Sequence, residues 1–221
     1  MPSPKQIQRL RDLLTDPSLP VRQQGLELLV VLSALLKDGD LAGMDMEQVE
    51  WSRQNLDETQ LSQVDLRRAS MVRASMRGTR LRGSNLEGAF LRRVDLCGAD
   101  LSGARLIDAD LAGADLRGAE LRGAVLDRAS LVGARLVGAD LRQTRLIGTD
   151  LREADLRESR LRGQDLRSVR LEGADLSGLW LGQVDLRGVL LDRVDLRGAD
   201  LRGALVDAEI QGAIMDEATK I

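Results

Sequence analysis

The sequence predicts a solenoid, a chain wound into stacked coils, and two observations support this prediction. Leucine occupies every fifth position from Leu81 to Leu201, twenty-five times in succession. A small residue stands two positions before most of these leucines, including nine consecutive alanines from Ala99 to Ala139. A short fixed period over most of a chain determines its architecture, and a small residue beside a large one suits a narrow, close-packed interior.

The five-residue spacing excludes the ordinary secondary structures. On an α-helix, five residues turn about 140° beyond a full revolution, so the leucines would spread around the whole helix. On a flat strand, an odd spacing sends successive leucines to opposite faces. Neither arrangement buries them together. The chain must therefore change direction about once every five residues, so that each leucine points toward a common axis.

The other positions of the repeat are also regular. Asp or Asn often stands immediately before the leucine, and glycine recurs two positions after it, where a turn needs a permissive backbone. The segment from Ala114 to Gly118 contains every element of the unit. Weaker units with Leu41, Met46 or Trp51 at the leucine position extend the pattern towards the N-terminus, and one residue drops out after Val206.

These units resemble the pentapeptide-repeat family, whose repeat reads A-(D/N)-L-x-x, over roughly residues 54–206. The resemblance implies an all-β solenoid, a right-handed quadrilateral parallel β-helix with four units, or twenty residues, in each coil. We assign residues 40–206 to this β-helix and residues 207–221 to irregular C-terminal repeats that form a cap. At about 4.8 Å per coil, the rod is on the order of 40 Å long.

Residues 1–39 are predicted to form a cap of two helices at the N-terminal end. Ser3 followed by Pro4 is typical of a helix start, and this helix is expected to end near Leu14. A second helix is expected from about Pro20 to Lys37, stopping near Gly39. Its apolar residues either cover the open end of the solenoid or serve as a dimerisation or docking element. The candidates for either role are Leu28, Leu29, Val31, Leu32 and Leu35.

Composition favours a non-enzymatic protein without a cofactor or metal. The chain has no histidine, which removes the commonest general base and metal ligand, and its only cysteine is Cys97. The sequence contains neither a phosphate-binding glycine loop nor a nucleophile with a nearby base, so no catalytic residue is predicted. The apolar run in the second helix is too short to span a bilayer and unlike a signal peptide, so we expect a cytoplasmic protein.

The family resemblance also raises a specific function. Some family members resemble duplex DNA in shape and charge, bind type II topoisomerases such as DNA gyrase, and give quinolone resistance or antibiotic self-immunity. With twenty residues per coil, one face would carry an acidic column, formed by Asp95, Asp115, Asp155, Asp175 and Asp195. Arginines two residues further on interleave with these aspartates, which predicts that they largely neutralise the column.

Charge disfavours direct binding to nucleic acid. Residues 55–206 contain 25 arginines and no lysine, against 23 acidic residues, so the repeat region is nearly neutral. A nucleic-acid binder usually has a clear basic excess and often stacking aromatic residues. The chain has one phenylalanine and no tyrosine.

Outward apolar residues are the better indication of a protein partner. Phe90 and Trp180 stand immediately before the leucine, a position that faces outward in the family. Val72 and Val132 are expected on the same face as Phe90, and Trp180 is a further candidate for partner binding, about half a coil from Leu190 and so not in one patch with it. Exposed apolar clusters often mark protein contacts, although isolated ones are ordinary.

We therefore predict a rigid scaffold for protein–protein interaction, with homodimerisation through the N-terminal helices left open. The alternative is a DNA-mimicking inhibitor or protector of DNA gyrase or topoisomerase IV.

One irregularity lies inside the predicted rod. From Gln164 to Val194 most residues at the small inward position are larger than alanine, so the coils there should be wider or differently cornered. The Gln164 amide would point inward and therefore needs an internal hydrogen-bond partner.

Overall fold

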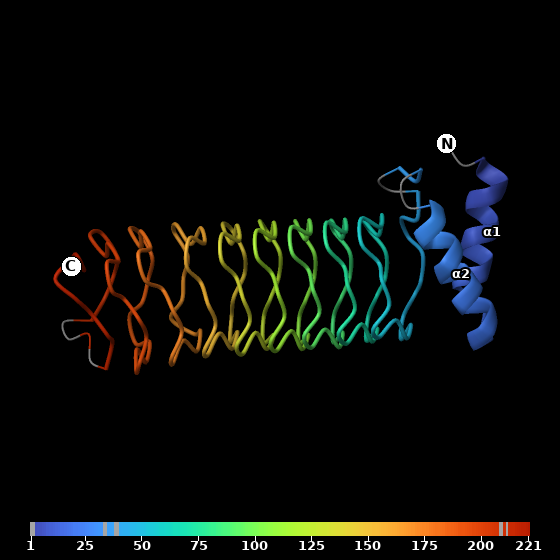
Figure 1. The fold of residues 1–221 in the computed structure, drawn as a ribbon. Helices are drawn as coiled ribbons and strands as arrows, with labels where there is room; N and C mark the ends of the chain where they lie inside the picture. Colours follow the sequence, from blue (N-terminus) through green and yellow to red (C-terminus); the bar gives the residue numbers. More distant parts are fainter. Residues whose placement is uncertain (1–2, 33–34, 38–39, 208–209, 211) are drawn as a thin grey trace.

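The molecule is a straight stack of coils with two helices at its N-terminal end (Figure 1). This computed structural model describes every residue except 1–2, 33–34, 38–39, 208–209 and 211. Helix α1 spans Pro4–Leu14 and helix α2 spans Leu19–Leu32. The coils begin near Leu41 and continue to the C-terminus at the opposite end of the rod.

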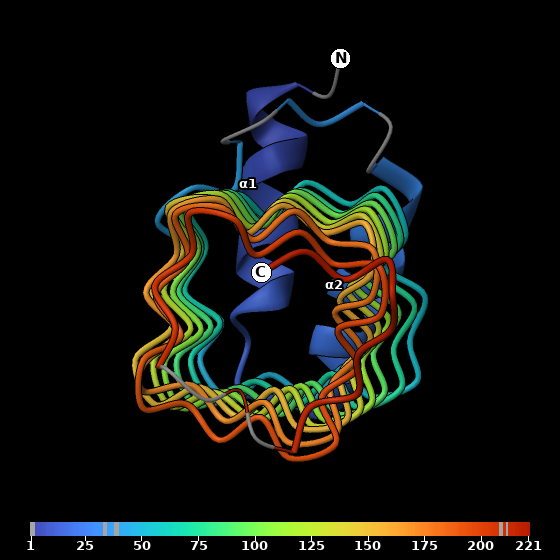
Figure 2. The same cartoon turned by 90° about the vertical axis from the view of Figure 1, so that its left-hand side faces the viewer.

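Each coil contains twenty residues and has four sides. Parallel β-bridges join residues twenty positions apart, as between Asp95 and Asp115, and the end-on view shows a four-sided outline (Figure 2). Within the described residues these pairings are isolated bridges, not continuous strands. The expected all-β solenoid is therefore shown only in part, because a two-residue turn after every central leucine leaves one bridging residue on each side of the coil.

We name the five positions of a unit by their roles. The small position and the bridge position precede the central residue, and the first and second turn positions follow it. In the unit centred on Leu96, the leucine N–H donates to Asp115 O in the next coil (2.8 Å). The N–H of Gly98, at the second turn position, also reaches the next coil, at Arg117 O (2.9 Å). Each coil is therefore held by its neighbours through backbone hydrogen bonds.

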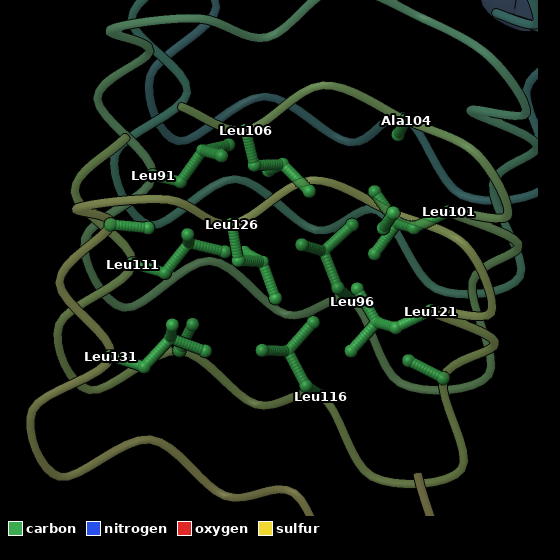
Figure 3. Close-up of a cluster of buried hydrophobic side chains, with 14 of the residues drawn as sticks. Leu91, Leu96, Leu101, Ala104, Leu106, Leu111, Leu116, Leu121, Leu126 and Leu131 are labelled. Atoms are coloured by element: carbon green, nitrogen blue, oxygen red, sulfur yellow. The ribbon is translucent and has the colours of Figure 1, made fainter. Parts of the chain in front are cut away.

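The core is a continuous stack of central leucines lined by small residues. Figure 3 shows leucines from successive units of one coil, such as Leu91, Leu96, Leu101 and Leu106, pointing into the interior. These leucines are at most 1 % exposed, and so is Ala104 at a small position. Burying one leucine contributes about 2 kcal/mol, so the stack is the main source of stability.

The second turn position adopts a left-handed backbone conformation in nearly every unit of the rod, with Ser168 as an exception. Gly118 has φ of 65°, and the same conformation occurs where the residue is not glycine, as at Arg73 (φ 57°). A side chain in this conformation costs about 1–2 kcal/mol. Glycine is therefore the residue that the fold favours here, and arginine is tolerated at a cost.

Several small positions carry polar residues whose side chains bond to the preceding coil. Thr79 Oγ1 donates to Leu56 O (2.8 Å), and Ser84 Oγ donates to Leu61 O (2.6 Å). Gln164 follows the same pattern, because its Nε2 donates to Leu141 O. The prediction that the Gln164 amide finds an internal partner is confirmed.

The coils around Gln164 are less regular than those in the middle of the rod. Among the described residues, three pairs at the expected spacing form no bridge. These pairs are Arg145 with Asp165, Arg160 with Trp180, and Arg170 with Leu190. Larger residues at the small position, such as Leu179, fill more of the interior. This agrees with the prediction of altered coils in this segment.

The start of α1 agrees with the sequence, whereas the end of α2 does not. Ser3 and Gln6 form a reciprocal capping box, and Pro4 is the first helical residue. Helix α2 was expected to reach Lys37, but the described helix ends at Leu32. Beyond it, the Lys37 N–H donates to the Asp40 carboxylate (2.8 Å) instead of continuing the helical pattern. The expected stop at Gly39 lies outside the described residues.

The two helices cover the N-terminal end of the leucine stack. Leu10, Leu14, Leu26 and Leu29 are buried and belong to the same hydrophobic cluster as the central leucines. Gly25 allows the helices to approach closely, because a Cβ there would lie 2.9 Å from backbone atoms of α1. The cap is therefore continuous with the core of the rod.

The C-terminal residues form a last, irregular coil. Asp195 bridges to Ile214, nineteen residues on, whereas Asp200 bridges to Lys220, twenty residues on. The predicted loss of one residue after Val206 is therefore confirmed, and the register is restored before Lys220. Met215 and Ile221 are exposed, so this end of the rod is less completely covered than the N-terminal end.

Candidate interaction surfaces

The five aspartates of the predicted acidic column lie on one face of the rod, and every one is ion-paired. The bridges place Asp95 against Asp115, Asp155 against Asp175, and Asp175 against Asp195. The ion pairs are Arg77–Asp95 (3.0 Å), Arg117–Asp115 (2.7 Å), Arg135–Asp115 (3.1 Å), Arg157–Asp155 (2.7 Å), Arg157–Asp175 (3.4 Å) and Arg197–Asp195 (2.6 Å). The arginines therefore compensate the negative charge of this column locally.

These aspartates also hold the turns of the backbone. Asp115 Oδ1 accepts the backbone N–H of Arg117 (3.2 Å), and the Arg117 guanidinium returns to the same carboxylate through Nε and Nη2. Asn55 accepts the N–H of Asp57 in the same way (3.0 Å). An Asx turn of this kind explains why Asp or Asn precedes the central leucine so often. Each of the five column carboxylates thus accepts a turn N–H in its own coil.

The pKa values of three of these aspartates reflect the same contacts. Hydrogen bonds from the Arg157 side chain hold the pKa of Asp155 below its ordinary value, as those from Arg197 do for the pKa of Asp195. Burial raises the pKa of Asp115, but hydrogen bonds from the Arg117 side chain and backbone outweigh it, so that this pKa is also lowered. These three carboxylates, Asp115, Asp155 and Asp195, are therefore charged at neutral pH and already hydrogen-bonded.

Phe90 is exposed on a different face, and the structure divides the patch predicted around it. Its side chain is 51 % exposed, and Val72, one coil away, is half-buried. Val132 is also half-buried, but the repeat places it two coils beyond Arg92. Arg92 forms an ion pair with Asp110 (3.2 Å), in the coil next to Phe90. By the register of the repeat, Phe90 and Val72 therefore lie on one face in adjoining coils, and this ion pair lies between them and Val132.

Trp180 lies on the side of the rod opposite Phe90, since the two positions differ by half a coil. Its indole ring lies directly over Gly182, where a Cβ would be 2.3 Å from the ring. The Arg162 guanidinium stacks on the same ring, 5.3 Å from its centroid. Trp180 is still 48 % exposed. Trp180 therefore cannot share one contact surface with Phe90, although both are candidates for partner binding.

The candidate cap residues divide between two environments. Leu29 and Leu32 are buried in the core, and Leu28 is partly buried against it. Leu28 and Leu32 also line a hollow of about 380 Å³ between α1 and α2. By contrast, Val31 is 72 % exposed and Leu35 is 50 % exposed. The first group serves the cap, and the second is available for contact with another molecule.

A concentration of arginine is a feature that our sequence analysis missed. Residues 66–94 contain eight arginines and one acidic residue, Glu87, although the repeat region as a whole is nearly neutral. Counting charge in a moving window would have found it, because the column-by-column count divides these residues among four faces. At one corner of the rod, Arg53, Arg73 and Arg93 follow one another at the second turn position.

Two classes of site are not found in the part of the chain that the structure describes. No group of three His, Cys, Asp or Glu side chains there is arranged to hold a metal ion. Of the helices described, none is long and apolar enough to cross a membrane.

Comparison with protein families agrees with the geometry of the coils. The pentapeptide-repeat family model matches in eight copies, and its matches include residues 34–71, 74–111, 104–143, 144–178, 170–206 and 181–219. The chain belongs to the pentapeptide-repeat family.

Solved structures similar to this chain include other pentapeptide-repeat proteins. HetL, involved in heterocyst differentiation regulation in the cyanobacterium Nostoc, is 32 % identical over 82 % of this chain and 86 % of its own, with a TM-score of 0.40. QnrB1, a plasmid-mediated fluoroquinolone resistance protein, is 16 % identical over 78 % of this chain and 94 % of its own, with a TM-score of 0.39.

A third solved protein, alr5209 from Nostoc, is 30 % identical over 53 % of this chain and 84 % of its own, with a TM-score of 0.29. No curated protein matches the chain closely enough to count as a relative.

Proposed function

We propose that this chain is a non-enzymatic scaffold, a rigid rod that binds a protein partner through side chains on its long faces. The observation that supports this most is the contrast between its outward polar and apolar groups. The column aspartates are engaged with arginines and turn amides of their own rod, whereas Phe90 stands half-exposed beside Val72. Exposed aromatic side chains rimmed by charge are typical of protein contacts.

The same engagement of carboxylates supports a non-enzymatic role. Catalysis by a pair of carboxylates needs one whose proton can be exchanged with a substrate near neutral pH. Asp155 and Asp195 have lowered pKa values and are held by arginine. The chain also lacks histidine.

We further propose that the coils of the rod wind in the right-handed sense, as the resemblance to the pentapeptide-repeat family implies.

The alternative function is DNA mimicry directed at DNA gyrase or topoisomerase IV. Such a mimic must present uncompensated negative charge, because phosphate charge dominates the association that it imitates. The ion pairs on the acidic column, above all the two arginines around Asp115, reduce that field. We therefore rank this function second.

A homodimer through the cap remains part of the proposal. The exposed Val31 and Leu35 supply apolar surface that the core does not use. The buried Leu29 and Leu32 do not contribute, because they cover the leucine stack.

Photocrosslinking at Phe90 tests the scaffold proposal. We expect benzoylphenylalanine at position 90, in the full chain expressed in its natural host, to form one discrete adduct with another protein. Leu190 is the matched control, since it stands at the bridge position on the same face, is exposed, and lies five coils away. An adduct at neither position, or equal labelling of many proteins at both, would contradict the proposal.

A further inference from the structure

Three arginines form a ladder at one corner of the N-terminal half of the rod. Arg53, Arg73 and Arg93 occupy the second turn position in three consecutive coils. The Arg53 N–H donates to Val72 O (2.9 Å), and the Arg73 N–H donates to Arg92 O (3.0 Å), so that each step is one coil. The backbones are thus about 4.8 Å apart along the rod, and the three exposed guanidinium groups project from one edge.

The fold favours glycine, and not arginine, at the three positions of this ladder. All three arginines have left-handed backbones, with φ of 60°, 57° and 55°. The next two coils place Gly113 and Gly133 at the same position, where no strain arises. Stacked like charges also repel one another. Neither the backbone nor the electrostatics of the rod therefore explains this arrangement.

The three guanidinium groups also lack a partner within the described structure. None forms an ion pair or a side-chain hydrogen bond, although carboxylates lie nearby along the chain. Those carboxylates have other partners. Glu50 accepts the Ser52 N–H (2.9 Å), and Asp57 accepts the Ser75 hydroxyl (2.7 Å) and the Arg77 N–H (2.8 Å). Asp95 pairs with Arg77, and Asp110 pairs with Arg92.

An apolar site lies beside the ladder. Val72 directly precedes Arg73 in the same turn, and Phe90 lies three residues before Arg93 on the adjoining face. A strip of unpaired positive charge therefore runs next to an exposed aromatic side chain and a half-buried valine. Charge complementarity to this strip requires an anionic ligand, and the apolar site requires that the ligand also carry hydrophobic side chains.

We propose that this corner binds an acidic segment of a partner protein, an extended stretch of Asp and Glu residues that includes a hydrophobic anchor. Its carboxylates pair with Arg53, Arg73 and Arg93, and the anchor packs on Phe90 and Val72. The proposal rests on the proposed scaffold function and names the chemistry of the partner.

A single peptide chain fits this strip better than a duplex does. Guanidinium groups bind carboxylates through paired hydrogen bonds, and a peptide also supplies the apolar anchor. A DNA duplex is wide enough to reach both faces beside the corner. There it would meet Glu50 and Asp110 on one face and Asp57 and Asp95 on the other.

Fluorescence anisotropy with a labelled peptide tests this proposal. The probe is Asp-Glu-Leu repeated three times, and the reference peptide is Asn-Gln-Leu repeated three times. We expect binding of the acidic probe alone, weakening as salt is added. The R53G/R73G/R93G variant should bind the probe at least ~30-fold more weakly, and F90A about fivefold more weakly.

The chain supplies a matched control for the triple variant. Arg193 has the same left-handed conformation (φ 56°) at the same corner, five coils from Arg93, so that R193G should bind the probe as the unaltered chain does. Glycine is the natural residue at Gly113 and Gly133, so the substitutions keep the fold, and the melting temperature verifies this.

Unchanged binding by the triple variant, or equal binding of the two peptides, would overturn the proposal. A competition experiment with a twelve-base-pair DNA duplex gives a further test. If the duplex displaces the acidic probe at a lower concentration than unlabelled acidic peptide does, the proposal is overturned in favour of nucleic-acid binding. If crosslinking at position 90 captures a protein while the acidic probe fails, only this inference is lost and the scaffold function stands.

Discussion

The residue preferences of the repeat follow from the demands of one short turn. The bridge-position carboxylate accepts the N–H of the first turn position, as Asp95 does from Cys97 (3.1 Å). The second turn position is left-handed, so glycine is favoured. The small position faces the core, where Ala99 is fully buried. Each preference was visible in the sequence, but only the hydrogen bonds explain why Asp is favoured at a position that lies outside the core.

Gly118 allows the cost of the turn conformation to be measured. Its φ is 65°, and a Cβ placed there would meet nothing within 4 Å. Gly118→Ala should therefore destabilise the rod through backbone strain alone, by about 1 kcal/mol in chemical denaturation. Ser177→Ala at a first turn position is the control and should change stability by less than about 0.5 kcal/mol. Equal stability of the two variants would show that the turn is not strained.

At the scale of elements, the cap and the coils differ in how fully the sequence predicts them. The start of α1 followed from Ser3, Pro4 and Gln6, because capping is local. The end of α2 did not, because the N–H of Lys37, the residue at which the helix was expected to end, donates to the Asp40 carboxylate. The number of sides per coil came from the family resemblance, since spacing alone does not distinguish three sides from four. The bridges between residues twenty apart confirm four.

Gly25 is the residue on which docking of the two helices depends. A Cβ there would lie 2.9 Å from Leu13 C and Leu14 N, which belong to the backbone and cannot move independently. Gly25→Ala should separate α1 from α2 and weaken the cap by about 1–3 kcal/mol. We expect faster amide hydrogen exchange in both helices, with residues 90–140 still protected.

Gln24→Ala is the matched control for Gly25→Ala, because Gln24 is exposed on the same helix. Its exchange should match that of the unaltered chain. If Gly25→Ala also leaves the helices protected, the close crossing does not exist in solution.

At the scale of the whole molecule, the distribution of charge matters more than its total. The net charge is −3, yet the acidic column is compensated and the ladder of Arg53, Arg73 and Arg93 is not. The sequence predicted which residues stack, because stacking follows from the twenty-residue coil. It also predicted that arginines interleave with the acidic column. It could not identify the free arginines, because that depends on which neighbour each carboxylate has already bound.

Gyrase supercoiling in the presence of increasing amounts of the purified rod, with and without a quinolone, tests the central claim most directly. If the acidic column is a structural feature of the repeat, the rod should neither inhibit nor protect gyrase up to micromolar concentrations. The control is the variant with Asp95, Asp115 and Asp155 changed to Asn. It should fold, because Asn55 already holds the same turn. Inhibition or protection by the rod that is lost in this variant would contradict our account and establish DNA mimicry.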